Sequence, residues 1–82
     1  MKIISWDKTL GILLPGSVRP RFVRDVAGAM HLLAGLWPVT YGRAYQRALA
    51  FCARALEGRM SATRARLAFI AAAREAKVQI TI

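Results

Sequence analysis

Residues 42–58 read GRAYQRALAFCARALEG, and this stretch decides the fold that we predict for the chain. At about 100° per residue, its apolar side chains gather on one side of a helix that runs from Gly42 to Glu57. Gly58 follows as a residue suited to the left-handed conformation in which many helices end. The predicted core face consists of Tyr45, Ala48, Leu49, Cys52, Ala55 and Leu56. The opposite side carries three arginines within about 40° of one another, namely Arg43, Arg47 and Arg54.

A second helix is predicted before this one. Asp25 is suited to accept hydrogen bonds from its first amides, and the helix should run to about Leu36. Trp37-Pro38 ends it, because proline disfavours helical geometry in the residue before it. An apolar stripe at helical spacing marks its buried face: Val26, Ala29, Met30, Leu33 and Trp37.

A third helix is predicted after residue 60. Ser61 or Thr63 should cap its start, and it should reach about Ala76. Its predicted apolar face consists of Leu67, Phe69, Ile70, Ala73 and Ala76. Four small side chains would let another helix approach closely, and these are Ala65, Ala68, Ala72 and Ala73.

The first quarter of the chain is expected to be extended, because it is rich in β-branched, aromatic and turn residues. Residues 2–6 and 10–14 are predicted as two strands joined by a hairpin at Asp7-Lys8-Thr9. Residues 18–24 form another predicted strand, and Pro20 places it at a sheet edge because proline lacks the amide hydrogen that a ladder needs. In residues 78–82, large apolar side chains alternate with polar ones, and this pattern predicts a closing strand.

Together these elements predict an α+β fold in a single domain of residues 1–82. A small N-terminal antiparallel β-sheet of two or three short strands packs on three α-helices. A short C-terminal strand is also expected, but the sequence does not determine which strand it pairs with. The apolar share of 56% excludes a disordered basic tail. The longest apolar stretch, residues 26–39, is shorter than the roughly 18 residues that cross a bilayer. We therefore expect no membrane insertion and a cytoplasmic location, with which the lone Cys52 agrees.

The spacing of residues in the second half resembles that of a known family. The shared positions are Trp37-Pro38, Gly42, Tyr45, Ala48, Cys52, Ala55-Leu56-Glu57-Gly58, Ala65-Arg66, Phe69-Ile70 and Glu75-Ala76. They are similar to a short bacterial family, domain of unknown function 982, found mainly in rhizobia and their relatives. That resemblance is expected to end near Glu75-Ala76, so that residues 77–82 extend beyond it. It supports the fold and implies no catalytic residue, because the family has no assigned activity.

The residues that carry chemistry predict no metal site, no cofactor and no catalytic residue. One histidine, one cysteine and four scattered acids cannot form a zinc cage within one chain, and neither glycine-rich phosphate loop occurs. Cys52 is interpreted as a core thiol rather than a nucleophile paired with His31, because it lies on an apolar helix face. His31 is expected at the polar margin of its helix, and Tyr41 and Tyr45 as packing residues with hydrated hydroxyl groups. A weak enzyme or ligand carrier near His31 and Tyr41 is the third hypothesis for the function.

The positive charge carries the functional signal. Thirteen Lys or Arg residues against four Asp or Glu residues give a net charge of +9. The favoured hypothesis is a small non-enzymatic interaction or adaptor module, whose partner is another protein or a second copy in a homodimer. The alternative is a nucleic-acid-binding accessory protein that contacts phosphates through Arg43, Arg47 and Arg54. Arg66 is expected to lie against the core, with Glu57 or Asp25 as its partner.

Overall fold

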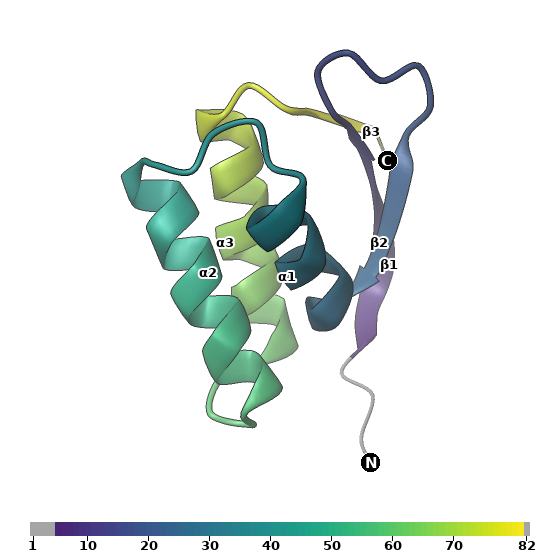
Figure 1. Cartoon of the computed structure of the whole chain (residues 1–82). Helices are drawn as coiled ribbons and strands as arrows, with labels where there is room; N and C mark the ends of the chain where they lie inside the picture. Colours follow the sequence, from purple (N-terminus) through teal and green to yellow (C-terminus); the bar gives the residue numbers. More distant parts are fainter. Residues whose placement is uncertain (1–4, 82) are drawn as a thin grey trace.

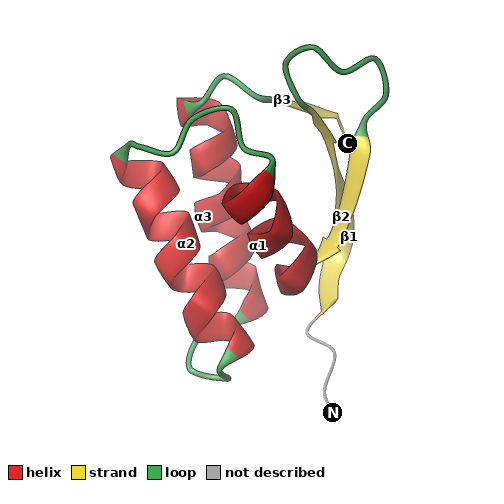
Figure 2. Cartoon of the chain, in the orientation of Figure 1, coloured by secondary structure: helices red, strands yellow, loops and turns green. Residues whose placement is uncertain are grey.

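A computed structural model describes residues 5–81, apart from the side chains of Ser5 and Asp7. It shows an antiparallel sheet with the helices on one side of it (Figure 1). Along the chain the elements are β1 (Ser5–Leu13), β2 (Arg21–Asp25), α1 (Val26–Gly35), α2 (Arg43–Leu56), α3 (Ala62–Glu75) and β3 (Gln79–Thr81). Figure 2 separates the helical part from the sheet by colour. The predicted α+β class is confirmed.

β1 is the central strand of the sheet, whose order is β2-β1-β3. The predicted hairpin at Asp7-Lys8-Thr9 is wrong, because these residues continue β1, while residues 2–4 lie outside the described part of the chain. Between the pairs Ser5↔Asp25 and Leu10↔Val23, five steps along β1 face two steps along β2. A β-bulge accommodates the extra residues of β1. It bends the strand, whereas the predicted hairpin would have reversed the direction of the chain.

β2 is shorter than predicted. Residues 18–20 lie in the preceding loop, where Val18 is 93% exposed. The ladder starts at Arg21, because Pro20 has no amide hydrogen to donate. β2 nevertheless lies at an edge of the sheet, as predicted.

β3 occupies the other edge, which answers the question of where the C-terminal strand pairs. Thr81 lies opposite Gly11, and Ile80 lies opposite Ile12. A side chain at Gly11 would overlap both the side chain and the backbone of Thr81, so glycine is required for this approach. Ile82, the last residue of the predicted strand, lies outside the described residues.

The helix boundaries agree with the predictions to within one or two residues. The Asp25 carboxylate accepts a hydrogen bond of 2.7 Å from the Gly28 amide and caps α1. The Ser61 hydroxyl accepts one of 3.2 Å from the Arg64 amide, so Ser61 rather than Thr63 caps α3. Gly58 follows α2 with a φ of 79°, the left-handed conformation expected there.

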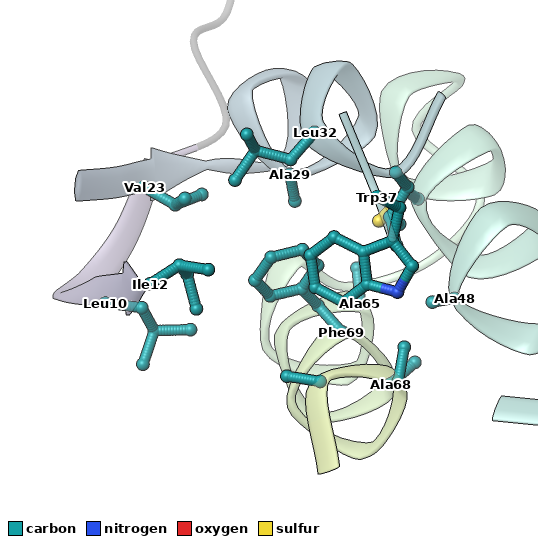
Figure 3. Close-up of a cluster of buried hydrophobic side chains, with 14 of the residues drawn as sticks. Leu10, Ile12, Val23, Ala29, Leu32, Trp37, Ala48, Ala65, Ala68 and Phe69 are labelled. Atoms are coloured by element: carbon teal, nitrogen blue, oxygen red, sulfur yellow. The ribbon is translucent and has the colours of Figure 1, made fainter. Parts of the chain in front are cut away.

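The core lies between the sheet and the helices. Phe69 of α3 is fully buried at its centre, with its ring 5.9 Å from that of Trp6 and 5.3 Å from that of Trp37. Leu10 and Ile12 of the sheet lie on one side of this ring, and Trp37 lies against the other (Figure 3). α1 and α3 both contact the sheet, whereas α2 packs mainly on those two helices and lies farthest from it (Figure 1). The predicted packing of the small residues of α3 is confirmed, since Ala65, Ala68, Ala72 and Ala73 are all buried.

Two leucines predicted in the core lie at the surface instead. Leu67 is 60% exposed, because it is two residues from Phe69 and therefore lies about 160° away around the helix. Leu56 is 47% exposed at the last position of α2, where the chain enters an exposed turn.

Arg66 lies partly buried against the core, as expected, but beside an aromatic ring. Its guanidinium carbon is 6.0 Å from the centre of the Trp6 ring. Asp25, one of its two expected partners, instead caps α1. The side chain of Arg66 thus packs against the core beside Trp6.

Candidate functional site

The three arginines predicted as site residues lie on the exposed face of the outermost helix. Arg43, Arg47 and Arg54 are all exposed, while the opposite face of α2 is buried. Arg43 and Arg47 line a shallow hollow of about 590 Å³, together with Gly42 and Gln46. Arg54 lies about two turns beyond Arg47 and does not line this hollow. The structure therefore groups two of the three predicted residues and separates the third.

A second, narrower hollow of about 230 Å³ lies between α2 and α3, and we call it the α2–α3 groove. Its walls combine cationic and apolar side chains. The guanidinium carbon of Arg64 lies 5.7 Å from the centre of the Phe51 ring, within the range of a cation–π contact. Phe51 is half-buried and Leu67 is exposed at the rim. The lining residues are Arg47, Phe51, Arg64, Leu67, Ala68 and Ala71.

Arg47 lines both hollows, so the two form one continuous surface. Near the start of α2 this surface is polar and cationic. Further along it becomes apolar, with cations on either side. The described residues that line it include no acidic side chain. Such a surface can bind an anionic group and an apolar group of the same partner.

Sequence reasoning did not place Phe51, Arg64 or Leu67 in this site. The helical spacing could have removed Leu67 from the core, since residues two apart point to nearly opposite sides of a helix. No local signal brings Phe51 and Arg64 together, because they belong to different helices. Their contact depends on how α2 and α3 pack against each other.

Glu75 holds the beginning of α2 from the end of α3. Its two carboxylate oxygens accept hydrogen bonds of 3.0 Å from the Ala44 amide and 3.1 Å from the Tyr45 amide. Gly42 has a φ of 111°, and a side chain there would overlap the Glu75 carboxylate. These amides are therefore already used, and an external anion near Gly42 would be bound by guanidinium groups rather than by the helix terminus.

The other candidate residues are scattered. The Tyr45 hydroxyl is buried and donates a hydrogen bond of 2.8 Å to the Leu33 carbonyl, so it is not hydrated as expected. Tyr41 is 71% exposed and is not a packing residue. Cys52 is fully buried, as predicted, and burial raises its pKa to about 11. His31 is exposed on α1, so it does not meet Cys52 as a catalytic base.

The described part of the chain, residues 5–81, also bears on a metal site and on a membrane span. Among the side chains that the structure describes there, no three histidine, cysteine or acidic residues lie together as a group that could hold a metal ion. None of its helices has both the length and the hydropathy of a membrane span.

Residues 8–80 match the model of a family described as "Protein of unknown function (DUF982)". The chain belongs to the DUF982 family. The match continues to residue 80, so the expectation that the family pattern ends near Glu75-Ala76 is wrong. The physical reason is that the tail belongs to the folded unit, since Val78 is buried and β3 pairs with the central strand. The DUF982 chain matches no curated protein and no solved structure.

Proposed function

We propose that this DUF982 chain is a small non-enzymatic interaction module that binds an acidic protein on the outer face of α2 and α3. One observation carries the proposal. The exposed guanidinium groups of Arg43, Arg47 and Arg64 surround hollows whose described lining contains no carboxylate. Arginine binds carboxylates through paired hydrogen bonds, and arginine and aromatic residues are enriched in protein interfaces.

The charge of the whole chain supports an anionic partner. Of its four acidic residues, Asp25 and Glu75 each accept backbone hydrogen bonds as helix caps. Their carboxylates are therefore engaged within the fold, and the net charge of +9 attracts an anionic partner to the chain as a whole.

A nucleic acid is the second candidate partner, and one specific arrangement favours it. Arg43, Arg47 and Arg54 lie along one face of α2 at axial separations of about 6 and 10 Å. Tyr41 precedes them with an exposed ring, and an exposed aromatic ring beside basic residues can stack on an unpaired base.

A pair of triple variants tests the proposal. In the first, Arg43, Arg47 and Arg64 are replaced by glutamate; in the second, Arg19, Arg21 and Arg24, in β2 and the loop before it, are replaced in the same way. All six side chains are exposed, and both variants change the net charge equally. Binding of a fluorescent polyglutamate peptide should be lost in the first variant and retained in the second. Equal losses in both would show that net charge alone attracts the peptide, and would contradict the proposal.

A pull-down from native cells, with and without nuclease, separates the two candidate partners. Recovery of an acidic protein that resists nuclease supports the favoured proposal, whereas recovery that nuclease abolishes supports the nucleic-acid alternative. A turnover that one substitution removes would contradict the non-enzymatic assignment. We also place the module in the cytoplasm, where a thiol such as Cys52 remains reduced.

A further inference from the structure

We propose that the α2–α3 groove binds an acidic amphipathic helix, which inserts one apolar side chain between Phe51 and Leu67. This inference rests on the proposed function and specifies the structure of the partner. Three features of the groove support it: its volume, the position of its charged side chains and the hydrogen bonding of its helical backbone.

The size of the groove indicates a single side chain as its occupant. Its volume of about 230 Å³ lies below the roughly 300–1,000 Å³ of pockets that hold small-molecule ligands. The apolar part of its lining comes from Phe51, Leu67, Ala68 and Ala71. A leucine or phenylalanine anchor from a partner would fill this space and cover Leu67, which is otherwise left largely in water.

The charges around the groove require acidic residues beside that anchor. Arg47 belongs to α2 and Arg64 to α3, and both line the groove together with Phe51. One of these guanidinium groups, that of Arg64, lies over the Phe51 ring. A partner therefore needs carboxylates about one helical turn from its anchor, which corresponds to positions three or four residues away.

The backbone of the groove favours a helix over an extended peptide. An extended peptide gains affinity by pairing with a free strand edge, whereas the groove walls are helices whose interior amides are bonded within their own turns. The small side chains of Ala68 and Ala71 on the α3 side of the groove let a third helix come close. An amphipathic helix laid along such a groove is a common mode of recognition.

Two other occupants fit this groove less well. A second copy of the chain, related by a two-fold axis through the groove, would bring this cationic surface against the same cationic surface of the first copy. A nucleic-acid base needs an open aromatic face, whereas Phe51 is half-buried and lies beneath Arg64. Both occupants remain outcomes of the test.

The test uses the full chain and two synthetic helical peptides with the same glutamates, one with a central leucine anchor and one with alanine there. Binding is measured by fluorescence anisotropy for wild type, Leu67→Ala and Leu56→Ala. Leu56 is also an exposed leucine of the α2–α3 pair, but it does not line the groove. Arg64→Gln and Arg54→Gln form the corresponding pair of charge variants.

We expect Leu67→Ala to weaken binding of the anchored peptide at least about tenfold, as for a central interface residue, and Leu56→Ala to change it less than about twofold. The loss from Leu67→Ala should be smaller for the anchor-free peptide, because the leucine and Leu67 act as a pair. Arg64→Gln should weaken both peptides more than Arg54→Gln does. This pattern, with each variant retaining the wild-type circular dichroism spectrum, supports the proposal.

Three results would overturn it. The first is equal affinity of the wild-type protein for the two peptides, which would contradict the anchored helix. If Arg47→Glu nevertheless abolished the binding of both peptides, the proposed function would still stand. The second is displacement of the peptide by single-stranded DNA whose own binding is unaffected by Leu67→Ala, which would assign the surface to nucleic acid. The third is a wild-type dimer that Leu67→Ala dissociates, which would assign the groove to a second copy.

Discussion

Glu75 is the last residue of α3, and its carboxylate completes the first turn of α2. Its two carboxylate oxygens accept hydrogen bonds from the Ala44 and Tyr45 amides, which lie 31 and 30 residues earlier in the chain. Gly42 makes this contact possible. Its φ of 111° suits glycine, and a side chain at this position would overlap the Glu75 carboxylate. Both residues lie within the part of the chain that matches the family model, and the contact joins the start of α2 to the end of α3.

We expect Gly42→Ala to destabilise the protein by about 2–4 kcal/mol, because it adds backbone strain and displaces a helix cap. The free energy of unfolding in urea measures this loss. Gly35→Ala is the control, since Gly35 lies at the end of α1 with open space around it and no left-handed φ. It should be neutral or slightly stabilising. Similar losses in both variants would argue against the role of Glu75.

Cys52 provides a prediction on reactivity. Its thiol is fully buried, and burial raises its pKa to about 11. At pH 8 the native protein should react with iodoacetamide far more slowly than free N-acetylcysteine, because only the thiolate is nucleophilic. Adding urea above the unfolding midpoint should remove the difference. Mass spectrometry measures both rates, and equal rates in the native state would show that Cys52 is accessible.

The raised pKa of Cys52 also predicts how the stability of the fold depends on pH. The folded pKa is raised above the ordinary value of 9.0, so the folded state retains the thiol proton to higher pH than the unfolded state does. The stabilisation from the buried neutral thiol is complete below about pH 9 and decreases as the pH rises towards 11. Cys52→Ala should show a flatter decline in this window than wild type. A parallel decline in both proteins would contradict the assignment.

At the level of elements, the attachment of β3 depends on a glycine in another strand. Gly11 lies opposite Thr81, and any side chain at Gly11 would overlap it. We expect Gly11→Ala to cost about 1–3 kcal/mol, as other overpacked positions do. Hydrogen exchange at residues 79–81 should accelerate more than exchange within α2. Uniform acceleration throughout the chain would mean that β3 does not open as a separate unit.

The helices show how far local sequence determines an element. The caps at Asp25 and Ser61 and the left-handed Gly58 could all be identified from residue type, because capping depends on atoms a few residues apart. The hairpin at Asp7-Lys8-Thr9 was predicted wrongly, because a short polar run fits both a turn and a bulged strand. Only the partner strand decides between the two.

At the scale of the whole molecule, a net charge of +9 belongs to a fold that measures only 35 × 24 × 18 Å, so its like charges lie close together. At about 10 mM salt the screening length is about 30 Å, so charges repel across most of the fold; at about 150 mM it is about 8 Å. We expect the melting temperature to rise between these concentrations. A gain of about 1 kcal/mol corresponds to roughly 4–8 °C for a domain of this size.

Differential scanning fluorimetry in sodium chloride measures this change. The variant with glutamate at Arg43, Arg47 and Arg64 serves as the control, because its lower net charge should give a smaller increase. A wild-type melting temperature that stays constant or falls with added salt would show that self-repulsion does not limit the stability of the fold.

The sequence by itself determined the three helices, the α+β class and the exposure of Arg43, Arg47 and Arg54. Those features follow from periodicity and from contacts a few residues apart. Only the tertiary structure decided the pairing of β3, the cap from Glu75 to α2 and the contact between Arg64 and Phe51. Each joins separate elements, so it depends on how those elements pack. The candidate site therefore changed from a line of arginines on one helix to a groove between two.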